Sequence, residues 1–460
     1  MLQKTLNFIY LSILQHQLNT VYIMKKGILL FIFLLTLTTF HGQTKLSLDD
    51  CIAIGFDNNL SLKNRTLDIQ KQQLINKKAF WNNFPRVNFG ASKDYEYGFN
   101  IEPSTNTRIN EDFGSNDFGL NASVDIFNLA KLKEHKKTKI DLYKSVVDFE
   151  ADRNIMLITI AQYYLEVMFN TEFVEILNKQ VLESENQLKR LNEALSYGYI
   201  AKSELYDAEA EFAVDKKAVL IANNNKDKSI RNLFNLINYD EDIHNVEFFD
   251  VKFRIDTSPI NDKNKYVSKA LENNALALSS KYSVESAQKN VEVFRAAYYP
   301  TLRLRYQLES FYTKSLSNPD EVVPTFEDQV RDNKTHFVGA SINVPIFNGF
   351  QNRYDVKIAK VDYEKAKIEQ EIVENNLRFE VEQTIQDLEN AISTYTTSLQ
   401  VLNAAQESYR ISRLKYEQGK INAFNYATAK ENLLKAEIDL LDSKYKIYYN
   451  KTKLNIITKK

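Results

Sequence analysis

Two hydrophobic patterns alternate along this chain. The first is a period-two alternation, which is typical of β-strands with one apolar and one polar face. After Pro85, apolar residues stand at 87, 89 and 91, with Asn88, Gly90 and Ser92 between them. The same alternation recurs over residues 118–126, 302–309 and 338–346. We therefore predict four strands, joined in pairs by polar loops at 98–115 and 314–334.

The second pattern is a 3,4 spacing of apolar residues, which indicates long packed helices. No proline interrupts the chain between Pro103 and Pro259 or after Pro345. Three such seams run along it: Leu177, Val181, Leu188, Leu191 and Leu195; Ile385, Leu388, Ile392, Tyr395, Leu399 and Leu402; Leu434, Ile438, Leu441, Tyr445 and Tyr448. A helix of about 70 residues is a rod of roughly 100 Å. The shorter helices are expected to stack end to end along the long ones.

The landmarks of these patterns recur in order, which indicates an internal duplication. Asn59 precedes Pro85 by 26 residues, and Asn274 precedes Pro300 by the same distance. Each copy reads helix, strand, loop, strand, very long helix, turn, helix. We predict repeats at 43–237 and 263–460, with a linker at 238–262. Alternating Val251, Phe253 and Ile255 predict a small mixed patch there, at the middle of the rod.

The first 42 residues form a segment of their own. Lys25 and Lys26 precede an apolar run at 27–40, which has the pattern of a secretory signal that starts at Met24 and is cleaved near Gly42. Residues 1–23 are then an upstream extension. Cys51 follows two aspartates instead of the small residues expected before a lipidated cysteine, so we interpret it as a helix residue.

Composition and motifs argue against several classes of protein. Acidic and basic residues nearly balance, at 60 and 59, so nucleic acid is not an expected partner. No phosphate-binding loop, dinucleotide-binding fingerprint, nucleophile elbow or zinc-binding pattern is present in the sequence. We therefore expect no enzyme activity and no cofactor.

The strands predict a shared transmembrane β-barrel, because apolar-out, polar-in alternation over about ten residues is typical of barrel strands. An amphipathic sheet on a soluble core is the alternative. Four strands in lipid would leave unpaired edges, so closure needs several chains. Eight strands fill their own lumen, whereas twelve leave a passage, which favours a trimer. Arg303 and Arg305 would then line the lumen and favour anions.

The ordered set of landmarks resembles the outer membrane efflux protein family, the TolC-like exit ducts of multidrug pumps and type I secretion systems. The resemblance covers about residues 45–457. It implies a mostly α-helical protomer, with a long antiparallel coiled-coil α-helical barrel and four strands of a trimeric 12-stranded barrel. It also implies an outer-membrane location with the helices in the periplasm, a periplasmic adaptor (membrane fusion protein) and an inner-membrane transporter as partners.

The resemblance assigns roles to the two predicted helix turns. They would form the closing periplasmic tip and dock the adaptor, through Gly198, Tyr199, Ile200, Ala201, Lys202, Ser203, Gly419, Lys420, Ile421, Asn422, Ala423 and Phe424. An acidic residue and a tyrosine latch the closed state in this family, and Glu204 and Tyr416 stand at those places. Some members of the family carry a pair of acids that narrows the entrance, and this chain has Asn425 and Thr428 at those two places. Glu204 and Asp207 could supply the negative charge instead. The alternative is that all are solvated helix-end residues.

Three interpretations stay open. A soluble periplasmic coiled-coil scaffold or adaptor would explain the rods but not the strands. An outer-membrane enzyme acting on polysaccharide would need a catalytic cleft. The aromatic residues between helices and strands form either a membrane-interface girdle or local packing: Trp81, Phe84, Phe127, Tyr298, Tyr299, Phe347 and Phe350.

Overall fold

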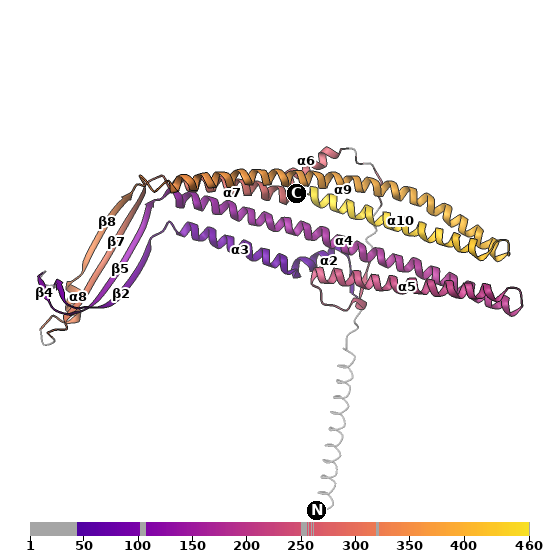
Figure 1. Ribbon diagram of the computed structural model, residues 1–460, viewed down its shortest axis with the longest axis horizontal. Coiled ribbons are helices and arrows are strands. Elements are labelled where there is room, and N and C mark those ends of the chain that lie inside the picture. Colours follow the sequence, from indigo (N-terminus) through magenta and orange to yellow (C-terminus); the bar gives the residue numbers. More distant parts are fainter. Residues whose placement is uncertain are drawn as a thin grey trace, which may run out of the picture.

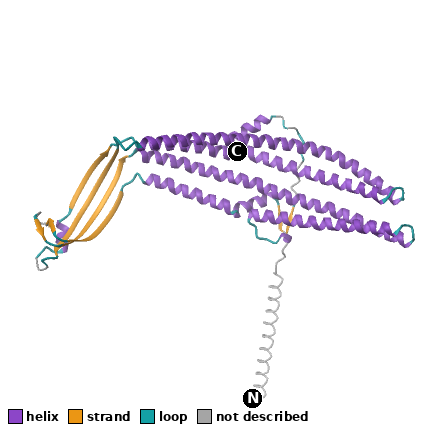
Figure 2. Ribbon diagram, viewed as in Figure 1, coloured by secondary structure: helices purple, strands orange, loops and turns teal. Residues whose placement is uncertain are grey.

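The computed structural model is an elongated, curved molecule with a sheet at one end and helices along the rest (Figures 1 and 2). It describes residues 44–101, 107–249, 255, 257–258, 260, 262–318 and 322–459. The predicted leader at 1–42 lies outside the described residues, as do Val251 and Phe253 of the linker.

The sheet has four antiparallel strands in the order β2-β5-β7-β8. Their bounds are Arg86–Glu96, Phe113–Phe127, Thr301–Ser315 and Thr335–Asn343. The four predicted strands are confirmed. The prediction that the last strand runs to Ile346 is wrong, because β8 ends at Asn343. Pro345 has no N–H to donate to a ladder, so the strand stops before it.

The outer loops contain more structure than the sequence predicts. The first folds into a hairpin of β3 (Phe99–Ile101) and β4 (Arg108–Asn110). The second contains the short helix α8 (Phe326–Asp332), which lies against β7. Gln329 fixes it there, accepting from the Thr313 amide at 3.0 Å and donating to the Thr313 carbonyl at 3.1 Å. The expectation of plain polar loops was therefore incomplete.

One helix continues each strand of the sheet. The four are α3 (Leu60–Trp81), α4 (Leu129–Ser196), α7 (Ala275–Ala296) and α9 (Gln351–Glu417). Their contacts give the lateral order α3-α4-α7-α9, which follows the strand order. At the far end α5 (Lys202–Ile237) packs on α4, and α10 (Ala423–Thr458) packs on both α9 and α4. The predicted rods are confirmed, since α4 and α9 have 68 and 67 residues.

The recurring asparagines make the joints where short helices stack. Asn59 caps the start of α3, accepting from the amides of Ser61 and Leu62. Its side-chain amide also donates to the Leu236 carbonyl in the last turn of α5, at 3.1 Å. Asn274 repeats this arrangement, because it caps α7 and donates to the Ile457 carbonyl at the end of α10, at 3.2 Å. One side chain thus satisfies polar groups at the ends of two helices.

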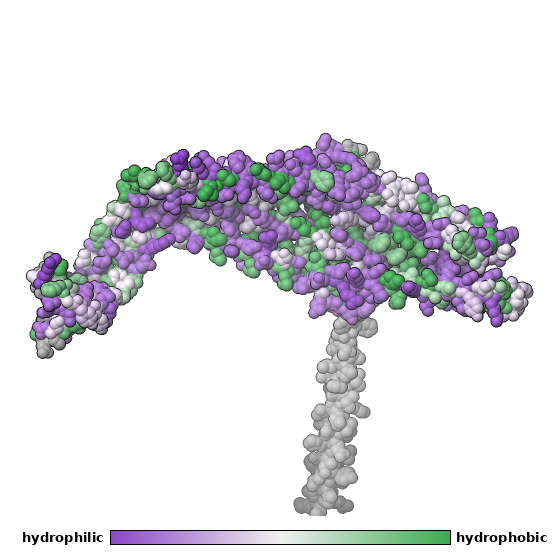
Figure 3. All heavy atoms as spheres, in the orientation of Figure 1, coloured by the Kyte–Doolittle hydropathy of each residue, from purple (hydrophilic) through white to green (hydrophobic). Residues whose placement is uncertain are grey.

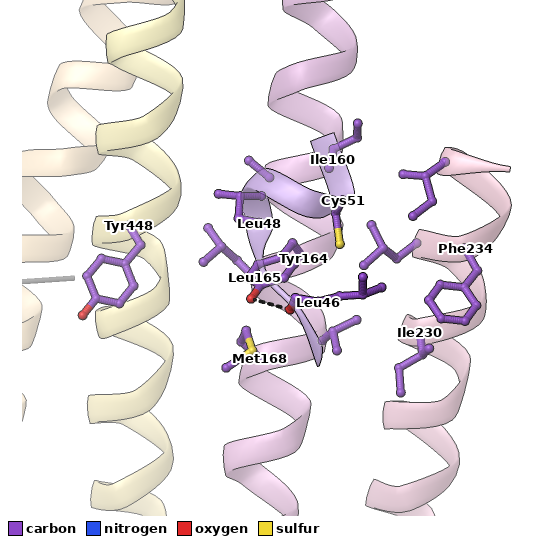
Figure 4. Close-up of a cluster of buried hydrophobic side chains, with 14 of the residues drawn as sticks. Leu46, Leu48, Cys51, Ile160, Tyr164, Leu165, Met168, Ile230, Phe234 and Tyr448 are labelled. Atoms are coloured by element: carbon purple, nitrogen blue, oxygen red, sulfur yellow. Dashed lines mark hydrogen bonds between the residues drawn. The ribbon is translucent and has the colours of Figure 1, made fainter. Parts of the chain in front are cut away.

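The largest apolar core of the described residues lies at the Asn59 joint, and part of it is drawn in Figure 4. A second core, with Ala270, Ala277 and Ile457, lies at the Asn274 joint. Strands β1 (Thr44–Leu46) and β6 (Val246–Phe248) pair in parallel beside the first core, so this part of the rod does combine strands with helices. The alternation of Val251, Phe253 and Ile255 that predicted a mixed patch stays untested, because the first two residues lie outside the described ones. Buried Tyr164 donates its hydroxyl to the Phe249 carbonyl at 2.7 Å. The helix α2 (Leu48–Asn58) starts with a capping box of Ser47 and Asp50.

Cys51 lies inside α2 and is fully buried in the larger core (Figure 4). Its position in a capped helix agrees with the interpretation of Cys51 as a helix residue. Burial raises the pKa of its thiol to about 12, and the charge of Asp50 adds to the shift. The thiol therefore stays protonated and unreactive.

In the described part of the chain, no helix combines the length and apolarity that a membrane-spanning helix needs.

Gly55 tests how tightly the mid-rod core is packed. A Cβ at this position would lie 2.7 Å from Ile160 Cδ1 and 3.0 Å from Met156 Cε. We expect Gly55→Ala to destabilise the fold by about 1–3 kcal/mol, measured as a lower midpoint for loss of the helical circular dichroism signal. Gly90→Ala is the control, since nothing lies within 4 Å of its added Cβ. Equal midpoints for the two variants would contradict the packing argument.

Candidate functional site

Two helix turns lie together at the end of the molecule farthest from the sheet (Figure 1). Gly198 and Gly419 have φ angles of 75° and 67°, which favour glycine. The backbone amide after each glycine donates an equivalent hydrogen bond back into the long helix. The Tyr199 amide donates to the Ala194 carbonyl at 2.9 Å, and the Lys420 amide donates to the Lys415 carbonyl at 2.8 Å. Both long helices therefore end in the same glycine-dependent turn, where the sequence placed the tips.

A cavity of about 1090 Å³ opens between the two turns. It brings together eleven of the predicted residues: Tyr199, Ile200, Glu204, Asp207, Tyr416, Gly419, Lys420, Ile421, Asn422, Ala423 and Phe424. The other six do not line it: Gly198, Ala201, Lys202, Ser203, Asn425 and Thr428. Asn425 and Thr428 start α10, where the Asn425 amide donates to the Asn422 side chain.

Tyr416 is half-buried and lines this cavity. Burial raises the pKa of its hydroxyl, and the carboxylate of Glu204 adds to the rise through its charge. Its ring stacks on that of Tyr426, with centroids 4.9 Å apart and planes 11° apart. Glu204 and Tyr416 are thus electrostatic neighbours across the two turns, as the resemblance implies, while their role as a latch stays a prediction.

Sequence reasoning missed the tyrosine pair behind Tyr416. The hydroxyls of Tyr426 and Tyr409 lie 3.1 Å apart, and the Tyr426 side chain is 1% exposed. Burial raises the pKa of Tyr426 to about 12. The two residues are 17 positions apart in sequence, on α10 and α9, so only the pairing of these helices brings them together.

A buried lysine on α10 ties the two hairpins together further from the tip. Lys430 Nζ lies 2.7 Å from both Glu211 Oε1 and Asp215 Oδ2 on α5, and 2.6 Å from Ser184 Oγ on α4. Ser184 in turn donates to Asp215. The lysine side chain is 7% exposed, so its charge depends on these partners.

Further ion pairs join the same hairpins on either side of Lys430. Nearer the tip, Arg190 Nη1 of α4 lies 2.6 Å from Glu417 Oε1 of α9. Farther away, Glu172 of α4 accepts from both Lys444 Nζ and the Tyr445 hydroxyl of α10, each at 2.7 Å. The α4–α5 and α9–α10 hairpins are therefore fastened by polar contacts at successive levels.

The polar face of the sheet carries charges of both signs. Arg303 Nε lies 2.7 Å from Asp125 Oδ1, and Lys131 Nζ lies 2.7 Å from the other oxygen of this carboxylate. The charge of Arg303 is therefore largely countered, which weakens the expectation that it favours anions. Arg305 lies two residues further along the same face.

Nearer the outer end this face turns acidic, which sequence reasoning missed. Asp94, Glu96, Asp117 and Glu309 share it by the strand register and line two recesses with Ser92, Ser115 and Thr313. Part of the signal was present in the alternation, because Glu309 occupies a polar position of a predicted strand, while Asp94, Glu96 and Asp117 continue the polar positions beyond the predicted spans. Their convergence required the pairing of three strands.

Comparison with known proteins gives a consistent relationship. Residues 266–457 match a family model described as "Outer membrane efflux protein". The outer membrane protein TolC of Escherichia coli is 20% identical over 378 residues, which cover 81% of this chain and 73% of TolC.

Solved outer-membrane proteins share the fold. The outer membrane protein VceC of Vibrio cholerae superposes with a TM-score of 0.75 at 16% identity, over 89% of this chain and 95% of that chain. The outer membrane channel CmeC of Campylobacter jejuni gives 0.75 at 19% identity, over 89% and 85%. With the sheet, the paired rods and the glycine turns, these matches make the chain similar to the outer membrane efflux protein family over residues 266–457, and similar in fold to solved outer-membrane channels.

Proposed function

We propose that the chain is one subunit of an outer-membrane exit duct for efflux or secretion, a passive conduit formed by three copies. The observation that carries the proposal is the open sheet. Strands β2 and β8 each have one hydrogen-bonded neighbour in the described chain. In a bilayer their free backbone groups would lack partners, so the sheet requires further copies to close.

The faces of the sheet support a wall between lipid and lumen. Phe89, Leu120 and Leu308 pair across three strands on one face, and Asn88, Asn121 and Gln307 pair on the other. An apolar outer face and a polar inner face are what a water-filled barrel requires. Twelve strands from three chains give an open lumen, whereas eight would be filled by side chains.

The helices support a duct that continues below the barrel. Each strand connects within a few residues to one long or stacked helix, and these helices neighbour one another in the same order as the strands. A closed ring of strands would therefore continue into a closed ring of helices. In this proposal the rods lie in the periplasm and their tips meet a periplasmic adaptor and an inner-membrane transporter. The exposed rings of Tyr199 and Phe424, 80% and 75% accessible, are suited to such a contact.

The proposal is tested by reconstitution of the purified protein into planar bilayers. We expect stepwise single-channel currents and a three-chain species after crosslinking in membranes. The soluble scaffold or adaptor alternative predicts recovery in the soluble periplasmic fraction without detergent and no channel activity. That result would falsify the duct.

The latch at the tip gives a specific prediction. If Glu204 and Tyr416 hold the tip closed, Glu204→Ala and Tyr416→Phe each raise single-channel conductance, because each removes a polar group from the cavity between the hairpins. Glu209→Ala is the control, since this exposed carboxylate of α5 lies outside the cavity. Unchanged conductance in both latch variants would discard the latch.

The duct wall also requires the α4–α5 and α9–α10 hairpins to stay in contact. A substitution of Lys430, which bridges them, tests this requirement. Lys430→Met leaves Glu211 and Asp215 beside an apolar side chain, and we expect a loss of about 3 kcal/mol of stability. The readout is the denaturant midpoint of the helical circular dichroism signal. Lys446→Met on the same helix removes only an exposed pair with Asp442 and should cost less than about 1 kcal/mol. Similar losses in both variants would contradict a structural role for Lys430.

The charged side chains on the polar face of the sheet predict which ions the barrel prefers. Asp117→Asn with Glu309→Gln removes negative charge from the outer half and should shift the reversal potential in a salt gradient toward anion preference. Arg305→Gln should shift it the opposite way. Both are measured with Glu204→Ala in the background, so that the tip does not dominate the current. Shifts of the same sign would show that these side chains do not face the conducting path.

A further inference from the structure

A stripe of basic and apolar side chains runs along the start of α4, beside the sheet. Its members follow one another by four or three residues, so they share one face of the helix, and all are exposed: Leu132, Lys136, Lys139, Tyr143 and Val146. The Nζ atom of Lys139 lies 5.9 Å from the centre of the Tyr143 ring. Neither Lys136 nor Lys139 forms an ion pair with a carboxylate in the described part of the chain. The stripe therefore presents uncompensated cations on an apolar background.

The stripe faces the convex side of the layer of helices. On α4, Thr138 donates to the Asn76 side chain of α3 at 3.1 Å, and Lys133 pairs with Glu292 of α7 at 2.7 Å. Thr138 comes five residues after Lys133, so the two neighbouring helices lie about 140° apart around α4. Lys139 lies roughly 170° from the midpoint between them. In a closed ring of helices the neighbours of each helix bend toward the lumen, so the stripe faces outward.

Helix α9 carries a matching group of exposed cations beside the sheet. They lie within roughly 15 Å of its start: Arg353, Lys357 and Lys360. Asn352 of the same helix donates to the Ala297 carbonyl at the end of α7, at 3.2 Å, and so marks the side that faces α7. Ala359 is buried one heptad later on that side. The three cations lie within about 60° of one another and roughly 100–160° from Ala359 around the helix.

The two groups of cations lie on the same side of the layer. Helices α4 and α9 both run away from the sheet, so their residues advance in the same rotational sense. On each helix one residue faces the preceding helix in the order α3-α4-α7-α9, Thr138 on α4 and Ala359 on α9. The next residue, about 100° further round, is a lysine in both cases. We call the five cations the basic collar: Lys136, Lys139, Arg353, Lys357 and Lys360.

Carboxylates at this height leave the collar with a net positive charge. Three acids stand two residues from a collar cation, which places them roughly 160° away around the helix: Glu134, Asp355 and Asp362. Glu292 of α7 already binds two lysines outside the collar, at 2.7 and 2.8 Å. Glu364 pairs with a lysine further along α9 at 3.0 Å. Glu285 is exposed, but it lies roughly 16 Å from the end of α7 at the sheet.

The collar lies at the height where a bilayer around the sheet would end. Its residues are roughly 3–15 Å from the first residue of α4 or α9, and both helices start within a few residues of a strand. Helical side chains lean toward the N-terminus of their helix, which for α4 and α9 is the end beside the sheet. The headgroup layer of one leaflet is about 5–8 Å thick. Lysines placed in this way can extend their ammonium groups to the headgroups.

Aromatic rings accompany the cations of α9. The Arg353 guanidinium lies 5.9 Å from the centre of the Phe350 ring, and Lys357 Nζ lies 5.6 Å from the centre of the Tyr354 ring. Hydrophilic and hydrophobic residues interleave along the upper edge of the rod beside the sheet, where α9 starts (Figures 1 and 3). Cations next to aromatic rings are typical of the boundary between lipid and water.

We propose that the basic collar binds the headgroup phosphates of anionic phospholipids in the inner leaflet of the outer membrane. The inference rests on the proposed function, because it needs the sheet in a bilayer, and it deepens that function by naming the lipid that meets the outside of the rod. Each lysine or arginine near an anionic bilayer surface adds to the attraction, which fades within a Debye length. A lipid is favoured over cell-wall polymer because the collar adjoins the sheet and not the middle of the rod.

Tryptophan fluorescence of the full-length protein in vesicles tests the proposal. Trp81 is the only tryptophan of the chain and ends α3 beside the sheet. Bromine atoms on lipid acyl chains quench a tryptophan that they contact, so quenching measures which lipid occupies its surroundings. We expect brominated phosphatidylglycerol to bind about tenfold more tightly there than brominated phosphatidylcholine, and this preference should shrink at high salt. The second readout is the ratio of the two lipids that stay bound after detergent extraction from equimolar vesicles.

Matched variants assign the preference to the collar. Replacing its four lysines together by glutamine should lower the preference at least threefold, and replacing them by arginine should keep it: Lys136, Lys139, Lys357 and Lys360. The control replaces four exposed lysines of the tip half by glutamine and should keep the preference: Lys216, Lys217, Lys228 and Lys435. An equal loss in the control set would show a general effect of net charge and overturn the inference.

The remaining outcomes separate the collar from the duct. A wild-type protein that conducts in bilayers but retains and contacts both lipids equally overturns the lipid site and leaves the duct intact. Absence of quenching by either lipid, together with absence of channel currents, counts against both. If the glutamine variant loses sedimentation with purified peptidoglycan while its lipid preference is unchanged, the lysines serve the cell wall and the inference is wrong.

Discussion

The structure depends on one constraint, which is that every strand in a bilayer must pair its backbone on both sides. The chain supplies four strands and leaves β2 and β8 with one partner each. In the proposed duct no water is present to satisfy these free edges, so the barrel would close only by pairing with further copies. The lateral order of the helices follows the strand order, since α3, α4, α7 and α9 each continue one strand.

Stability away from the membrane has a different origin. The mid-rod core gathers apolar side chains from several helices and a small parallel strand pair, and it lies where the short helices meet end to end. Asn59 and Asn274 make those junctions possible, because each satisfies the start of one helix and the end of another. Toward the tip the contacts between hairpins become polar, with Lys430 buried among Glu211, Asp215 and Ser184.

This change from apolar to polar packing bears on function. An apolar core resists separation at any pH or ionic strength, whereas a set of ion pairs and a tyrosine cluster can rearrange between discrete partners. The part of the rod that holds the tip cavity is therefore the part whose contacts are easiest to exchange. In the proposed duct, the chain combines a fixed apolar core at the middle of the rod with an adjustable end.

The sequence by itself determined the strands, the rods, the glycine turns and the recurring asparagines, because these follow from periodicity and from local backbone preferences. It also placed Glu204 and Tyr416 near one another through the resemblance. Only the tertiary structure decided that Asp125 neutralises Arg303, that Tyr409 meets Tyr426 and that Lys430 is buried. Those contacts join residues on different helices or strands, and a one-dimensional pattern does not encode which faces of two long elements meet or at what height.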